Sequence, residues 1–165
     1  MKKLMLMFAL VALFTTNVMA QSPWKIVDME YITKTGGNCE YDDETCTATF
    51  KGKYDRWFDL PELSGDLTNH KNMSVTVLKS NVILSFYVRY RDADGNIKQV
   101  SAQTFWMRMG KGIDNKKTFK VDLSNKGKIS DDILKNVTSI RVSMAKEASG
   151  AEEPWFCQFG DIVVE

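Results

Sequence analysis

Residues 81–100 read NVILSFYVRYRDADGNIKQV, and this stretch decides the fold. Every second residue of its first half belongs to an apolar face, which consists of Val82, Leu84, Phe86, Val88 and Tyr90. The opposite face carries Ile83, Ser85, Tyr87 and Arg89. A period of two residues predicts a β-strand that buries one face, because successive side chains of a strand point to opposite sides.

The centre of this stretch, DADGN at residues 92–96, has two interpretations. Its acidic residues resemble the start of an EF-hand calcium loop, which also needs glycine at the sixth position and glutamate at the twelfth. Counted from Asp92, those positions hold Ile97 and Gln103. Asp-Gly between two extended runs is instead typical of a tight turn, because glycine tolerates positive φ. We therefore predict a β-hairpin here and not a metal loop.

The same alternation recurs along the chain. It is found at residues 71–79, 117–123 and 138–145, and the chain closes on an apolar run at 159–165. One short helical turn, capped by Ser130, is predicted within residues 129–137. Strands with one apolar face must be covered by a second layer. The predicted fold is therefore all-β, a two-sheet antiparallel β-sandwich.

The amino-terminal segment predicts where the protein is located. Lys2 and Lys3 precede an apolar run over residues 4–14, and Val18 and Ala20 give the small-residue pattern of a signal-peptidase site. The run is too short to span a bilayer, which indicates a cleaved signal peptide at residues 1–20. We expect a single domain over residues 21–165, secreted across the inner membrane to the periplasm or the cell exterior, without insertion in a membrane.

The charge balance excludes some partners. The chain has 22 basic and 21 acidic residues. Loss of Lys2 and Lys3 with the signal leaves a nearly neutral domain. The absence of basic clusters argues against nucleic acid and against an anionic membrane surface as partners.

Three cysteines enter an oxidising compartment on this interpretation. Cys39 and Cys46 are close in sequence, so we predict a disulfide between them. Cys157 would then be a buried thiol that packs as a small apolar side chain. A bond from Cys157 to either of the other two remains the alternative.

A catalytic set is hard to assemble from this sequence. His70 is the single histidine, which excludes zinc sites built on several histidines, and no GxSxG elbow presents a serine. A glycosidase needs only two carboxylates, but no pair stands out by spacing. We expect a protein that is not an enzyme.

A metal site at the chain ends has two interpretations. Glu30 and Asp161 lie in the first and last predicted strands, which neighbour each other in many sandwiches. They could hold a structural calcium ion together with backbone carbonyls. They could equally be solvated acids at strand ends, and we favour this second interpretation.

The order of the elements also resembles a known family. The segments 56–95, 117–124, 131–144 and 159–165 follow each other as in the galactose-binding-like jelly-roll β-sandwich. Carbohydrate-binding modules of secreted bacterial polysaccharide-degrading enzymes have this fold. The resemblance covers about residues 50–165. It implies a non-catalytic module whose sugar site lies on loops at one end or on a sheet face.

Candidate ligand residues are aromatic or arginine side chains that alternation or loop position directs away from the core. Aromatic rings stack on sugars, while planar polar groups fix the hydroxyls. The candidates are Trp57, Trp155, Tyr87, Arg89, Arg141 and Trp106. If Arg89 and Arg141 converge, an acidic sugar or a protein partner is favoured, because guanidinium groups suit carboxylates.

These observations lead to a hypothesis with two alternatives. We expect a secreted, non-catalytic module that binds a polysaccharide or oligosaccharide through exposed aromatic residues. The first alternative is a protein-interaction or structural accessory of the cell envelope. The second is a small glycan-active hydrolase.

Overall fold

A computed structural model describes residues 24–26, 39–42, 44–51, 56–60, 63–105 and 112–165 of the chain. Its elements are, in chain order, β1 (Trp24–Ile26), β2 (Cys39–Asp42), β3 (Thr47–Phe50), β4 (Trp57–Leu60), β5 (Asn72–Ser80), β6 (Val82–Arg91), β7 (Ile97–Thr104), β8 (Lys117–Asp122), α2 (Asp131–Leu134), β9 (Val137–Glu147) and β10 (Trp155–Val164). The predicted signal peptide at residues 1–20 lies outside the described residues.

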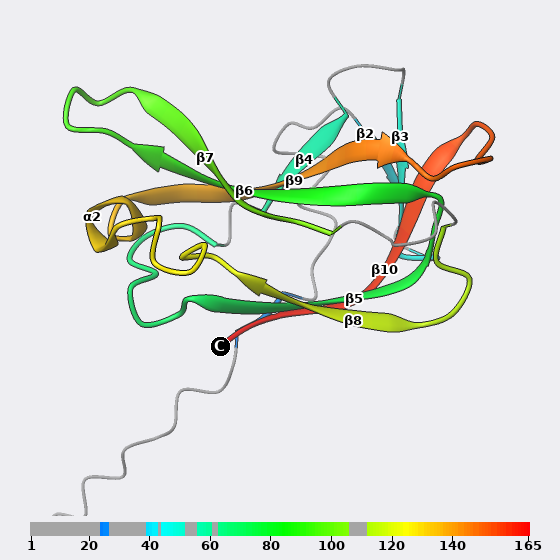
Figure 1. Cartoon of the computed structure of the whole chain (residues 1–165), viewed down its shortest axis with the longest axis horizontal. Helices are drawn as coiled ribbons and strands as arrows, with labels where there is room; N and C mark the ends of the chain where they lie inside the picture. The colour runs from blue at the N-terminus through cyan, green and yellow to red at the C-terminus, as the bar shows by residue number, and fades with distance from the viewer. Residues whose placement is uncertain (1–23, 27–38, 43, 52–55, 61–62, 106–111) are drawn as a thin grey trace, which may run out of the picture.

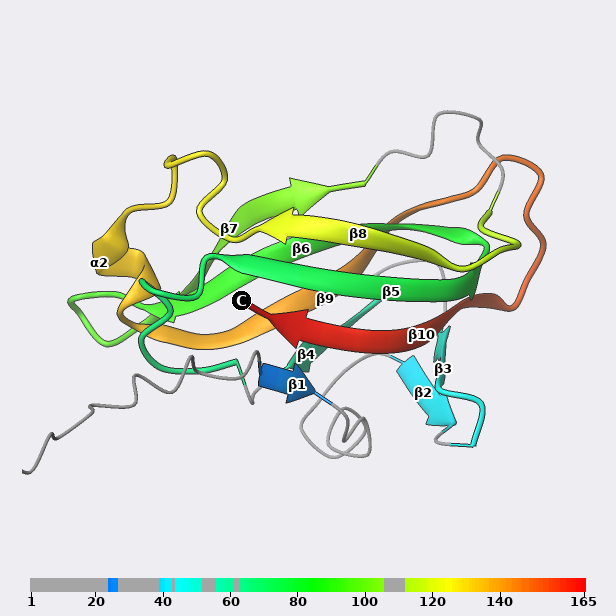
Figure 2. The same cartoon turned by 90° about the horizontal axis from the view of Figure 1, so that it is seen from below.

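The strands form two antiparallel sheets that pack face to face (Figure 1). One sheet has the order β2-β3-β10-β5-β8, and β1 also pairs with β10. The other sheet has the order β4-β9-β6-β7. Figure 2 shows that β10, β5 and β8 run side by side in one layer. The predicted two-sheet β-sandwich is confirmed, and its arrangement is compatible with a jelly-roll-like fold.

The predicted hairpin at DADGN is also confirmed. β6 pairs with β7 from Arg91 opposite Ile97 back to Ser85 opposite Thr104. The Asp92 carboxylate accepts hydrogen bonds from the N–H groups of Asp94 and Asn96 at 3.0 and 2.8 Å. Gly95 has a φ of 83°, which a residue with a side chain rarely adopts. Asp92 thus shapes the turn through hydrogen bonds from the turn's own backbone.

Aromatic side chains join the two sheets through the core. Phe58 of β4 stacks on Phe50 of β3, with ring centroids 6.3 Å apart. It also meets Phe159 of β10 edge to face at 5.6 Å. Near the other edge, Phe105 lies between Phe86 of β6 and Phe119 of β8. Burial of each large ring contributes about 2 to 3 kcal/mol, so these contacts fix one sheet over the other.

The cysteines do not form the predicted Cys39–Cys46 disulfide, and Cys157 is also unbridged. The reason is the β2–β3 hairpin, in which Cys39 lies opposite Phe50. Cys46 is four residues before Phe50, which separates the two cysteines by roughly 13 Å along the strand. A disulfide needs Cα atoms within about 7 Å. The sequence did not predict this hairpin, because each of its strands has only four residues.

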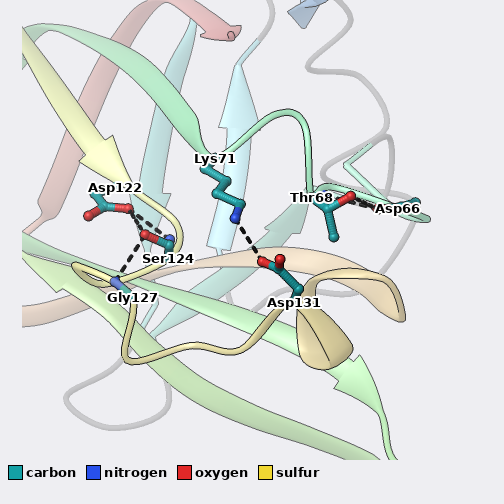
Figure 3. Close-up of polar contacts among 7 residues, drawn as sticks. All are labelled: Asp66, Thr68, Lys71, Asp122, Ser124, Gly127 and Asp131. Carbon is teal, nitrogen blue, oxygen red and sulfur yellow. Dashed lines mark hydrogen bonds and ion pairs between the residues drawn. The ribbon is translucent and has the colours of Figure 1, made fainter.

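The predicted helical turn forms as α2, but its cap differs from the prediction. Ser130 stands at the N-cap position and makes no side-chain capping hydrogen bond. The Lys71 ammonium instead contacts the Asp131 carboxylate at 2.7 Å, as Figure 3 shows. Leu134 is buried against the sandwich. The turn is therefore held by burial and by an ion pair to the segment that precedes β5.

Among the residues that the structure describes, no helix combines the length and the apolar character needed to cross a bilayer.

Candidate ligand-binding site

The outer face of the four-stranded sheet is organised by β4. Phe58 and Leu60 point into the core and are fully buried. Because side chains alternate along a strand, Trp57 and Asp59 lie on the outer face. Asp59 is opposite Arg141 of β9, and Arg141 is opposite Tyr87 of β6. The register therefore places one aspartate, one arginine and one tyrosine in a row across three strands.

Two arginines converge on the Asp59 carboxylate. Arg141 donates from Nε to Oδ1 at 2.8 Å and from Nη2 to Oδ2 at 3.0 Å, which is a bidentate pair. Arg89 of β6 donates from Nη1 to Oδ2 at 2.6 Å. The side-chain exposed fractions are 8% for Asp59, 16% for Arg141 and 25% for Arg89. Asp59 thus fixes both guanidinium groups at the surface of the sheet.

Trp57 belongs to the same cluster. The Arg141 guanidinium carbon lies 3.5 Å from the centroid of the Trp57 ring, which is a close cation–π contact. One face of the indole is therefore occupied by the guanidinium group. Any sugar that stacks on Trp57 must use the opposite ring face.

We call Trp57, Asp59, Tyr87, Arg89 and Arg141 the arginine face. Its two guanidinium groups and one carboxylate carry a net charge of +1. Asp59 accepts three of the arginine hydrogen bonds. Within the described part of the chain, no further hydrogen bond uses the remaining N–H groups of these arginines. Since each guanidinium has five N–H donors, the face retains donors for an anionic or polyhydroxylated ligand.

Trp155 lies elsewhere in the molecule. The sequence predicted a side chain directed away from the core, but Trp155 is the first residue of β10 and is 9% exposed. Its partner across the sheet is Phe50. The Arg56 guanidinium carbon lies 5.1 Å from its ring centroid. Trp155 therefore packs at the end of the core and does not join the arginine face.

The remaining predicted site residues, Trp106, Glu30 and Asp161, do not belong to the arginine face. Trp106 and Glu30 lie outside the described residues. Asp161 is exposed on β10, and β10 pairs with β1. In the described ranges, no three His, Cys, Asp or Glu side chains gather closely enough to hold a metal ion. Both interpretations of Glu30 and Asp161 therefore stay as predicted, with solvated acids favoured over a calcium site.

The residue that sequence analysis missed is Asp59. It is the shared acceptor of the cluster, and its signal was present in the sequence. In WFDL, residues 57–60, the apolar Phe58 and Leu60 alternate with Trp57 and Asp59. Four residues give only two alternations, so this short strand was not recognised as one.

No family model matches the chain, and no curated protein matches it.

Proposed function

We propose that this protein is a secreted, non-catalytic binding module for an acidic saccharide, which lies across the arginine face. The observation that supports the proposal is the convergence of Arg89 and Arg141 on Asp59, beside Trp57 and Tyr87. The proposal keeps the predicted resemblance to galactose-binding-like carbohydrate-binding modules. It places the ligand on a sheet face and not on the loops at one end.

The chemistry of the face favours a saccharide that carries a carboxylate or a sulfate. A guanidinium fork matches the geometry of such groups and binds them with charge-assisted hydrogen bonds. Asp59 orients both arginines before the ligand arrives, which lowers the entropy lost on binding. The rings of Trp57 and Tyr87 supply apolar area for the C–H surface of a sugar, with a phenol hydroxyl available for hydrogen bonding.

Isothermal titration calorimetry with two ligands of equal length tests the proposal. Trigalacturonate carries carboxylates, whereas maltotriose is neutral. We expect trigalacturonate to bind more tightly. Arg89→Gln should weaken its binding about tenfold or more, since a hydrogen bond to a charged group contributes about 1.5 to 3 kcal/mol. Arg91→Gln is the matched control, because Arg91 is exposed at the end of the same strand and donates to the Gly95 carbonyl.

Three outcomes would contradict the proposal. The first is that trigalacturonate and maltotriose bind the wild type with equal affinity and that Arg89→Gln changes neither affinity. The second is capture of an envelope protein by this face without saccharide binding, which favours the accessory role. The third is release of shortened oligosaccharides during the titration, which favours the hydrolase.

A further inference from the structure

We propose that the saccharide site continues past the edge of the four-stranded sheet into the groove between β7 and β8, so that the ligand is an extended acidic polysaccharide. The proposal deepens the proposed function and rests on it. The groove lies at the open side of the sandwich, where the edge strand of one sheet faces the edge strand of the other. Its volume is about 490 Å³.

Side chains bridge the two strand edges and form the walls of the groove. The Gln103 Oε1 atom accepts a hydrogen bond from the N–H of Asp122 at 3.0 Å. The Asn125 Nδ2 atom donates to the carbonyl of Ser101 at 3.1 Å. Each amide uses one end for this bridge. The Gln103 amino group and the Asn125 carbonyl oxygen make no further hydrogen bond within the described residues, so both can serve a ligand.

The groove has a net positive charge, because two lysines and one aspartate line it. Lys120 and Lys126 line it and are exposed. In the described part of the chain, neither ammonium group has a carboxylate within ion-pair distance. Asp122 also lines the groove, but its carboxylate already accepts from the N–H and hydroxyl of Ser124 (Figure 3). It also accepts from the N–H of Lys126. The groove therefore offers donors and cations to an anion.

The register connects this groove to the arginine face. The row of residues Asp59, Arg141 and Tyr87 continues to Ser101 of β7, which lies opposite Tyr87. Ser101 is exposed, and its carbonyl is the one that Asn125 bridges. From Arg141 on β9 to Ser101 on β7 the row covers two strand spacings, about 10 Å, and Lys120 and Lys126 lie beyond it across the groove. A ligand of one or two sugar units on Arg141 would not reach Lys120 or Lys126, whereas a longer chain would.

The test measures how removal of the two lysine charges affects the affinity for a short and for a long ligand. Calorimetry would measure the affinity of a dimer and a hexamer of galacturonic acid for the wild type and for the Lys120→Gln/Lys126→Gln variant. The double variant should weaken hexamer binding about tenfold and leave dimer binding unchanged, since each exposed ion pair contributes modestly. Lys79→Gln/Lys116→Gln is the control with equal loss of charge. Lys79 and Lys116 are exposed at the other end of β5 and β8.

The outcomes separate the two proposals. Loss of hexamer affinity in the groove variant alone supports the extended site. Unchanged hexamer affinity overturns it and indicates that the lysines only protect free strand edges. An equal loss for dimer and hexamer, or for both double variants, also overturns it, because that result reflects general charge attraction. Failure of both ligands to bind the wild type would overturn the proposed function itself.

Discussion

Asp59 is the residue on which the candidate site depends. It is nearly buried and is the acceptor for two arginines from different strands. Removal of one partner from such a cluster leaves the other charges desolvated and unpaired, which costs more than the pair itself contributes. The conformation of the arginine face and the stability of the sheet are therefore coupled at this carboxylate.

We predict that Asp59→Asn lowers the free energy of unfolding by about 2 kcal/mol, because the amide keeps an acceptor but loses the charge that balances the two arginines. Urea denaturation followed by tryptophan fluorescence measures this change. Asp94→Asn is the control, since Asp94 is exposed at the hairpin tip. Equal urea midpoints for Asp59→Asn and the wild type would refute a structural role for the cluster.

The cysteines permit a second test at this scale. Burial raises the pKa of the Cys39 thiol to about 11, and burial also raises the pKa of Cys157. Cys46 is exposed. Because the thiolate is the reactive form, we expect a thiol reagent to label Cys46 in the folded protein and the other two only after unfolding. Cys46→Ser should abolish the native labelling. A folded wild type in which Cys46 resists labelling until a reductant is added would restore the predicted disulfide.

At the scale of elements, the β6–β7 hairpin shows how local sequence determines register. Asp92 organises the turn with its carboxylate, and Gly95 supplies the positive φ. This β-turn also determines which residues of β7 lie opposite each residue of β6. Ser101 is placed beside Tyr87 by this pairing. An error in the turn would therefore displace the edge of the proposed binding row.

We predict that Gly95→Ala destabilises the protein by about 1 kcal/mol. An added Cβ meets nothing within 4 Å, so the cost comes from the backbone conformation alone. Asp94→Ala is the control at the neighbouring position, whose φ is not positive. Thermal unfolding by circular dichroism measures both variants. A Gly95→Ala variant as stable as Asp94→Ala would contradict this account of the turn.

Long elements could be predicted from the sequence, and short ones could not. β5, β6 and β9 have nine to eleven residues, and the apolar residues predicted to face the core are buried in all three except Tyr90. This is why Arg89 and Arg141 could be assigned to the outer side. The prediction that β6 buries only one face is wrong for its first half, because Ile83 and Ser85 of the opposite face are also buried. β2, β3 and β4 have four residues each. Their side chains give too few alternations, and only pairing with longer strands determines their place.

The same limit explains the candidate site. Alternation assigns a side chain to a face, but the order of the strands in the sheet decides which side chains meet. Arg141 meets Asp59 because β4 pairs with β9, and the two strands are about 80 residues apart in sequence. Trp155 was wrongly assigned to the outer side because β10 begins at residue 155, before the apolar run at 159–165 that predicted the strand. As part of β10, its ring packs against the core.

At the scale of the whole molecule, several turns carry aspartates whose pKa lies below the ordinary range. A hydrogen bond from Thr45 lowers the pKa of Asp42, one from Thr68 lowers that of Asp66, and one from Lys98 lowers that of Asp92. Burial alone would raise the pKa of Asp122, but hydrogen bonds from Ser124 and Lys126 lower it. Each carboxylate is thus better stabilised in the folded chain than in the unfolded chain.

We predict that the protein loses stability in acid. A lowered folded-state pKa contributes stability above the unfolded pKa, and this contribution disappears as the pH falls through the folded value. The loss should therefore begin near about pH 4 and increase below it. Urea midpoints measured from neutral pH downward test this. The Asp66→Asn/Asp92→Asn variant should show a smaller decline than the wild type, and an identical decline would contradict the assignment.

The central claim is that the outer face of the four-stranded sheet binds an acidic saccharide. Amide and side-chain NMR spectra recorded during titration with trigalacturonate test it most directly. We predict that the resonances that shift are those of Trp57, Tyr87, Arg89 and Arg141, including the indole and guanidinium N–H signals. Shifts confined to β5, β10 or the loops at one end of the sandwich, or a spectrum that does not change, would contradict the claim.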